Sequence, residues 1–93
     1  GPLRQLELSR TLGAMGAMIG SHEYPYYSTH VLACIPDPLP VEVLDWGDRL
    51  FRAVPRPDES GRLPVQGPGF GVEVDLDLLE QWSVARVRKR CDA

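Results

Sequence analysis

The chain has 93 residues, of which 10 are Lys or Arg and 13 are Asp or Glu, and its formal net charge at pH 7 is −3. This balance provides no basic field to attract nucleic acid or an anionic membrane, so we expect neither as a partner. Its two cysteines lack paired spacing, which argues against a disulfide framework and fits a reducing, cytoplasmic environment. No apolar run approaches the roughly 18 residues that a membrane-spanning helix needs.

The first predicted element is a helix over residues 3–15. Leu8, Leu12 and Met15 recur at the spacing i, i+4 and i+7, which places them on one face of a helix. Gly16 follows and is expected to end the helix in a left-handed conformation. We expect this helix to contribute packing rather than chemistry.

A short apolar run over residues 17–20 comes next, without the alternation of a half-exposed strand. This pattern is typical of a strand buried on both faces of a parallel sheet. The chain then passes through a loop with His22, Glu23 and three tyrosines into a helix that Ser28 is expected to cap. A strand, a polar loop and a helix in this order are typical of a barrel whose active site lies at the loop end.

The second half of the chain reads as strands joined by turns. Three prolines within residues 36–40 are expected to end the second helix. Alternation over residues 41–46 predicts a strand with Glu42 facing outward. The sequence DESG at residues 58–61 predicts a reversal into a second pair of strands.

The end of the chain is predicted to hold a glycine-rich turn, a short helix and a basic tail. The loop GPGFG at residues 67–71 leads into a predicted strand at 72–74, so we interpret it as a turn rather than a phosphate-binding loop. Asp75 or Asp77 is expected to cap a helix that extends through Trp82. The basic residues beyond it are interpreted as a solvated tail.

Several of these segments together resemble one enzyme family. Ser21-His22, the sequence STHVLA at residues 28–33, GRLPV at 61–65 and GPGFGV at 67–72 resemble the mandelate racemase and muconate-lactonizing branch of the enolase superfamily. The resemblance covers residues 1 to about 82. It corresponds only to the carboxy-terminal part of a longer enzyme, because a complete barrel needs roughly 250 residues.

The resemblance implies an α/β fold class. Residues 1–38 would be the last helix-strand-helix portion of a (β/α) TIM-type barrel. Residues 39–93 would be a small β-rich return segment that contributes to the capping domain, with a polar tail at 83–93. We therefore expect the remainder of the barrel, or another chain, to complete the fold, and a homo-oligomer when it is complete.

The same resemblance implies an activity. Members of this branch are metal-dependent lyases and isomerases, such as acid-sugar dehydratases and racemases, that abstract a proton α to a carboxylate. The implied cofactor is Mg²⁺, with ligands outside this chain, and the implied substrate is a small carboxylate such as a sugar acid. Dehydration, racemisation and cycloisomerisation all stay open.

Three residues of the 21–36 loop are candidates for the site. Relatives often place a glutamic acid four residues after the His, where it donates a hydrogen bond to a substrate carboxylate oxygen, and here that position is Tyr26. A phenol stays protonated at neutral pH and can donate the same kind of bond, so Tyr26 is the candidate catalytic residue. His22 and Glu23 are candidates for substrate binding. His30, inside the predicted helix, is expected to be structural, and packing is the alternative role for Tyr26.

A second function from another class stays open. The chain could be a non-catalytic remnant or an independently folded interaction module that keeps the family's tail without its metal. The coding sequence before Gly1 distinguishes the two, because an enzyme would carry acidic residues at the ends of three successive strands. We do not expect the isolated chain to be active in either case.

Overall fold

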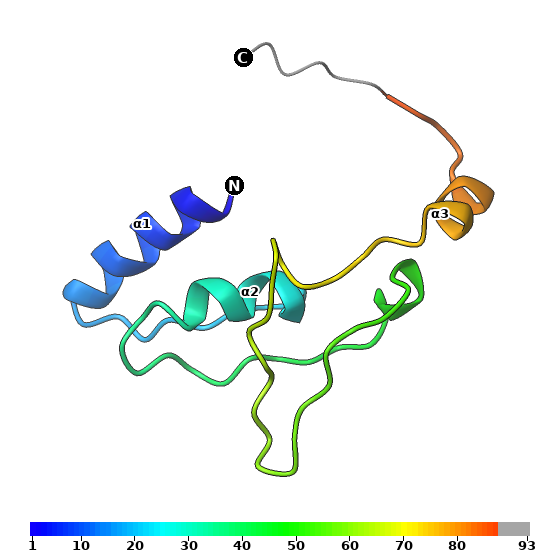
Figure 1. Cartoon of the computed structure of the whole chain (residues 1–93). Coiled ribbons are helices and arrows are strands. Elements are labelled where there is room, and N and C mark those ends of the chain that lie inside the picture. Colours follow the sequence, from blue (N-terminus) through cyan, green and yellow to red (C-terminus); the bar gives the residue numbers. More distant parts are fainter. Residues whose placement is uncertain (88–93) are drawn as a thin grey trace.

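The computed structural model describes residues 1–87. It contains three α-helices and one 3₁₀ turn, joined by long irregular segments (Figure 1). In chain order these are α1 (Pro2–Ala14), α2 (Pro25–Leu32), η1 (Asp48–Leu50) and α3 (Leu76–Trp82). None of the helices within these residues is long and apolar enough to cross a membrane.

Helix α1 confirms the first sequence prediction. Pro2 lies in its first turn, where a missing N–H costs nothing. Its end is a Schellman arrangement, in which Gly16 N–H donates to Gly13 (2.9 Å) and Ala17 N–H donates to Leu12 (3.0 Å). Gly16 has a φ of +87°, which a side chain would make costly.

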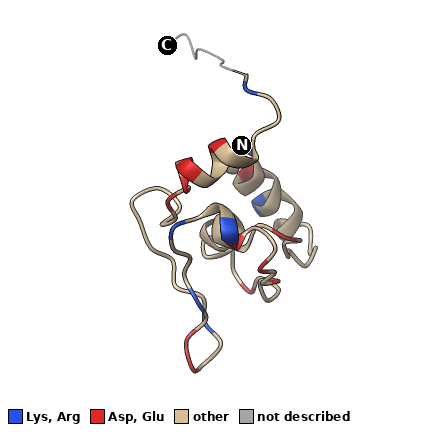
Figure 2. Ribbon diagram, turned by 90° about the vertical axis from the view of Figure 1, so that its right-hand side faces the viewer, with Lys and Arg blue, Asp and Glu red and all other residues tan. Residues whose placement is uncertain are grey.

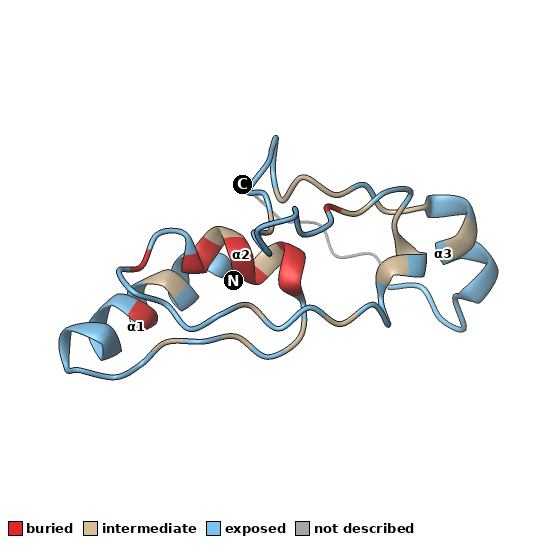
Figure 3. Ribbon diagram, turned by 90° about the horizontal axis from the view of Figure 1, so that it is seen from below, coloured by how far each residue is buried: buried red, intermediate tan, exposed pale blue. Residues whose placement is uncertain are grey.

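Helix α2 is the most buried element of the chain. Figure 3 shows that buried residues concentrate on this helix. Val31, Leu32 and the following Ile35 form the hydrophobic core, and Leu6 of α1 and Ile19 pack against them together with Val41. Two stretches that precede the 21–24 loop in sequence, α1 and residues 17–20, thus help to bury α2.

The β-rich part of the fold prediction is wrong. No residue from 1 to 87 belongs to a β-strand, and the nearest approach to a sheet is one isolated antiparallel bridge between Phe51 and Val74. The α/β fold class, with a barrel segment before a β-rich return segment, is therefore contradicted. At the predicted strand 17–20, Ile19 accepts one hydrogen bond from Leu39 N–H (2.7 Å). An apolar run becomes a strand only where neighbouring strands pair with its backbone, and here the pairing does not extend beyond single bonds.

Two predicted helix caps had different outcomes. Ser28 does not cap α2, because the helix already begins at Pro25 and places Ser28 inside it. Asp75 does cap α3, where its carboxylate accepts hydrogen bonds from Asp77 N–H and Leu78 N–H, both at 3.1 Å. The predicted helix through Trp82 is thus confirmed with Asp75 as its cap.

The reversal predicted at residues 58–61 is also confirmed. The Asp58 carboxylate accepts hydrogen bonds from Ser60 Oγ (2.7 Å), Ser60 N–H (2.8 Å) and Arg62 N–H (3.0 Å). These bonds, the one from the Ser60 hydroxyl first, lower the pKa of Asp58. Two backbone bonds also close the turn, from Asp58 N–H to the carbonyl of Arg62 and from Gly61 N–H to the carbonyl of Asp58, both at 2.9 Å. The turn thus forms without the predicted strands on either side of it.

Much of the apolar surface stays exposed. The chain has a solvent-accessible area of 7716 Å², whereas a compact protein of 10.3 kDa exposes about 5,400 Å². Leu8, Leu12 and Met15, the predicted packing face of α1, are exposed, as are Met18 and Trp82. Figure 2 shows acidic and basic residues interspersed along the chain. Residues 88–93 of the predicted polar tail lie outside the described residues.

Candidate functional site

The loop that leads into α2 has an unusual backbone. Glu23 (φ +56°) and Tyr24 (φ +48°) both adopt the left-handed conformation, which costs roughly 1 to 2 kcal/mol for each non-glycine residue. The carbonyl of Tyr24 offsets part of this cost, because it accepts hydrogen bonds from Tyr27 N–H (3.1 Å) and Ser28 N–H (3.0 Å). Consecutive strained residues of this kind cluster at functional sites.

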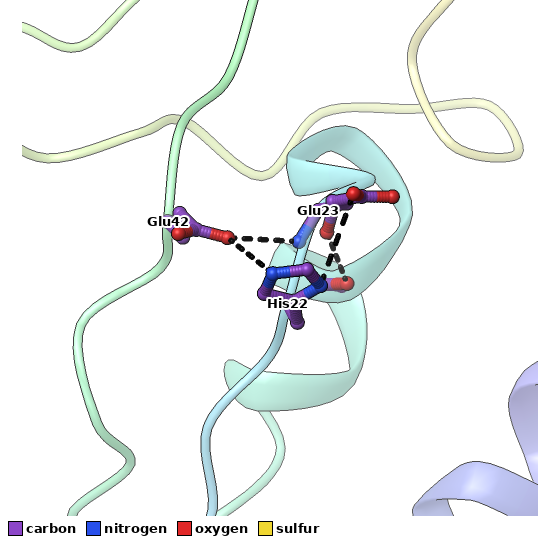
Figure 4. Close-up of polar contacts among 4 residues, drawn as sticks. His22, Glu23 and Glu42 are labelled. Atoms are coloured by element: carbon purple, nitrogen blue, oxygen red, sulfur yellow. Dashed lines mark hydrogen bonds and ion pairs between the residues drawn. The ribbon is translucent and has the colours of Figure 1, made fainter.

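Glu42, in the segment at residues 41–46, contacts this loop. Glu23 N–H donates to Glu42 Oε2 at 3.1 Å. His22 Nε2 lies 3.8 Å from the same oxygen, and His22 Nδ1 lies 3.9 Å from Glu23 Oε1 (Figure 4). The His22 side chain is 80 % exposed, so even with a protonated imidazole water screens these two contacts and they stabilise the fold little. The structure thus brings both predicted substrate-binding residues together around a carboxylate that the sequence placed on an outward strand face.

Tyr26 lies in the first turn of α2 and is only 4 % exposed. Its hydroxyl donates a short hydrogen bond to Asp48 Oδ1, at the start of η1. Its ring meets Phe51 edge-on, with 5.9 Å between the ring centroids. Burial, followed by the hydrogen bond to Asp48 and the charge of that carboxylate, raises the pKa of Tyr26 to about 12.

Arg56 lies on the other side of Asp48. Its Nη1 atom is 2.9 Å from Asp48 Oδ2, yet this oxygen has no aligned hydrogen bond among the described residues. The close N–O distance makes the contact an ion pair, and the orientation of the guanidinium rules out a directional bond. The side chain of Asp48 is 12 % exposed, so this ion pair is less screened than those on the open surface.

A cavity of about 300 Å³ lies beside Tyr26. Its lining includes the polar side chains of Glu23, Tyr24, Tyr26 and Asp48. The remaining lining is apolar or glycine and comes from Pro25, Leu44, Trp46, Gly47, Leu50 and Phe51. Two of the three predicted site residues therefore share one cavity, whereas His22 is not part of its lining.

His30 has the structural role that its position in a helix predicted. Its Nδ1 atom is 2.9 Å from the carbonyl oxygen of Tyr26, and Nε2 is 2.9 Å from that of Gln66. The ring of Phe70 meets the imidazole edge-on at 5.4 Å. His30 thus ties α2 to the glycine-rich turn, away from the cavity.

The described residues do not form a metal site. Among residues 1–87 no group of three His, Cys, Asp or Glu side chains is arranged to hold a metal ion. Mg²⁺ prefers a nearly octahedral set of oxygen ligands. The carboxylates of Glu23 and Glu42 supply oxygens, but the imidazole nitrogens of His22 lie within 4 Å of both carboxylates. The donor set here therefore does not fit Mg²⁺, and no step below passes through a metal.

Sequence reasoning missed Glu42, Asp48 and Arg56 as parts of the site. Asp48 meets Tyr26 across 22 positions of sequence, and Glu42 meets Glu23 across 19. No periodic pattern connects residues at such separations. The one local feature of Asp48 is its place at the start of a 3₁₀ turn. An acidic residue is common there because the helix dipole favours negative charge, so this position does not indicate a site.

Comparison of the chain with protein-family models, curated proteins and solved structures found no match in any of the three.

Proposed function

We propose that this chain forms one wall of the active site of a metal-dependent lyase or isomerase that abstracts a proton α to a carboxylate. The acid-sugar dehydratases and racemases of the enolase superfamily are the nearest functional models. The observation that carries the proposal is the shared cavity, which Tyr26 and Glu23 both line at a loop with two consecutive left-handed residues. The proposal places the Mg²⁺ ligands and the catalytic base outside the described residues.

The chemistry gives Tyr26 a definite role. Removing the α-proton leaves an enediolate, in which negative charge develops on the former carboxylate oxygens. A donor already held in place stabilises that charge more than it stabilises the substrate, and so lowers the barrier. With a pKa of about 12, Tyr26 keeps its proton over the whole physiological range and can serve as this donor.

Glu23 and His22 would bind the rest of the substrate. Glu23 lines the cavity, where its carboxylate can accept hydrogen bonds from the hydroxyl groups of a sugar acid. His22 lies beside Glu23, outside the cavity lining, and can reach a substrate that extends past the loop. A volume of about 300 Å³ is at the small end of ligand sites, which suits a small acid.

Proton exchange in the full-length protein tests this proposal. The protein is incubated in D₂O with Mg²⁺ and a panel of sugar acids, and the α-proton signal is followed by ¹H NMR. We expect that signal to be lost, or a dehydrated product to form, for at least one acid. Tyr26→Phe should slow that reaction on the order of 10² to 10³-fold, as loss of one such donor does.

Tyr24→Phe is the matched control. Tyr24 lines the same cavity but is 68 % exposed, so removal of its hydroxyl should leave the rate within about twofold. Equal effects of the two substitutions, or no exchange with any acid, would contradict the proposal.

The exposed face of α1 supports a second candidate, an interaction module. Leu8 on α1, and Met15 and Met18 just after it, are each more than half exposed, and large exposed apolar side chains that form a patch mark interaction sites. A module would bind a partner through α1 and would show no proton exchange. Leu8→Asp should then abolish binding of the partner without any effect of Tyr26→Phe.

A further inference from the structure

The hydroxyl of Tyr26 has a single proton, which it donates in a hydrogen bond to Asp48. An ionised carboxylate has only acceptor oxygens, so in the contact between them Tyr26 must be the donor. While that bond exists, the phenol oxygen can only accept further hydrogen bonds and cannot donate one. Tyr26 can therefore donate a hydrogen bond to a substrate oxygen only after its hydrogen bond to Asp48 has broken.

The position of Asp48 is itself controlled. Its Oδ2 atom lies 2.9 Å from Arg56 Nη1, while Oδ1 takes the Tyr26 proton. Arg56 draws negative charge toward Oδ2 and so weakens the hold of Oδ1 on that proton. Arg56 comes from the segment after η1, and its side chain is 62 % exposed, so it contributes charge to this contact rather than packing.

We propose that Asp48 is the positioning residue for Tyr26, and that Arg56 sets how tightly Asp48 holds the hydroxyl proton that a substrate must take over. The role of the substrate rests on the proposed function. The hydrogen bond between Tyr26 and Asp48 does not depend on that function, because it exists in the protein without substrate.

The charged groups around the hydroxyl lead to opposite expectations for two substitutions. Burial alone keeps a phenol protonated, so Asp48→Asn should lower the pKa of Tyr26 only by the part that the carboxylate contributes. Arg56→Gln should raise that pKa, because the attraction of the guanidinium for the phenolate is lost. The charge of Asp45 acts on the pKa of Tyr26 in the same direction as that of Asp48, more weakly, and Glu23 lines the same cavity.

The experiment uses 3-fluorotyrosine at position 26 of the full-length protein, because its phenol ionises at lower pH than that of tyrosine. The ¹⁹F shift is titrated in the parent protein and in Asp48→Asn, Arg56→Gln and Asp45→Asn. We expect Asp48→Asn to lower the pKa of the ring by about one unit or more, the scale of a contact charge. Asp45→Asn removes the same charge nearby without a hydrogen bond, and should lower it by less.

Two results would overturn the proposal. One is an equal shift in Asp48→Asn and Asp45→Asn, since the hydrogen bond would then contribute nothing. The other is a lowered or unchanged pKa in Arg56→Gln, which is expected to fold because its side chain is largely exposed. Neither measurement needs turnover, so a protein that fails the proton-exchange assay can still confirm the hold of Asp48 on Tyr26.

Discussion

Residues 1–35 contain both of the longer helices and the core of Val31, Leu32 and Ile35. Residues 36–87 contain one short helix and one 3₁₀ turn, and side-chain hydrogen bonds and ion pairs hold much of them in place. The difference teaches that the first region is stabilised by burial of α2. The second region packs onto it through Val41, Phe51 and Phe70 and through a few polar contacts, without a buried core cluster of its own among the described residues. The Tyr26–Asp48 bond is one of the links between the two regions.

The largest expected effect concerns the 93-residue chain by itself. Because Leu8 and Leu12 of α1 and the adjacent Met15 are exposed, we expect the isolated chain to be poorly folded or to associate. Sedimentation over a range of concentrations, with circular dichroism during heating, measures this. A monodisperse monomer that unfolds cooperatively at low concentration would show that the small core of the first region suffices.

A substitution in each region tests where stability comes from. Leu32 is only 4 % exposed, so Leu32→Ala in the full-length protein should lower the free energy of unfolding by about 2 to 5 kcal/mol. Val65, in the second region, is 51 % exposed, and Val65→Ala should change it by less than about 0.5 kcal/mol. Urea unfolding measures both. A similar loss in both variants would mean that the second region buries a core of its own.

The smallest expected effect concerns the link between the regions and depends on pH. The pKa of Tyr26 is about 12 in the folded chain, against an ordinary value of 10.0, so the folded state holds this proton more tightly than the unfolded state. Its contribution is complete below about pH 10 and is lost as the pH rises toward 12, up to about 2 to 3 kcal/mol. The free energy of unfolding of the parent protein should therefore approach that of Tyr26→Phe over this range. A constant difference between the two proteins would show that the raised pKa does not contribute to stability.

Part of the candidate site could be predicted from the sequence. Their place after Ser21-His22 predicts Tyr26 and Glu23 as site residues, and both line one cavity of the structure. Their partners Glu42 and Asp48 could not be predicted, because each comes from a segment 19 or 22 positions away. How those segments meet depends on the path of the whole chain.

The sequence by itself determined the elements whose causes are local. Gly16 terminates helix α1 after Ala14, Asp75 caps α3, and Asp58 builds a turn, because each depends on neighbours within a few positions. Only the tertiary structure decided that the apolar run at 17–20 and the alternating segment at 41–46 form no strands. A strand needs backbone partners from elsewhere in the chain, and an apolar pattern reports a tendency to be buried without naming the segment that pairs with it.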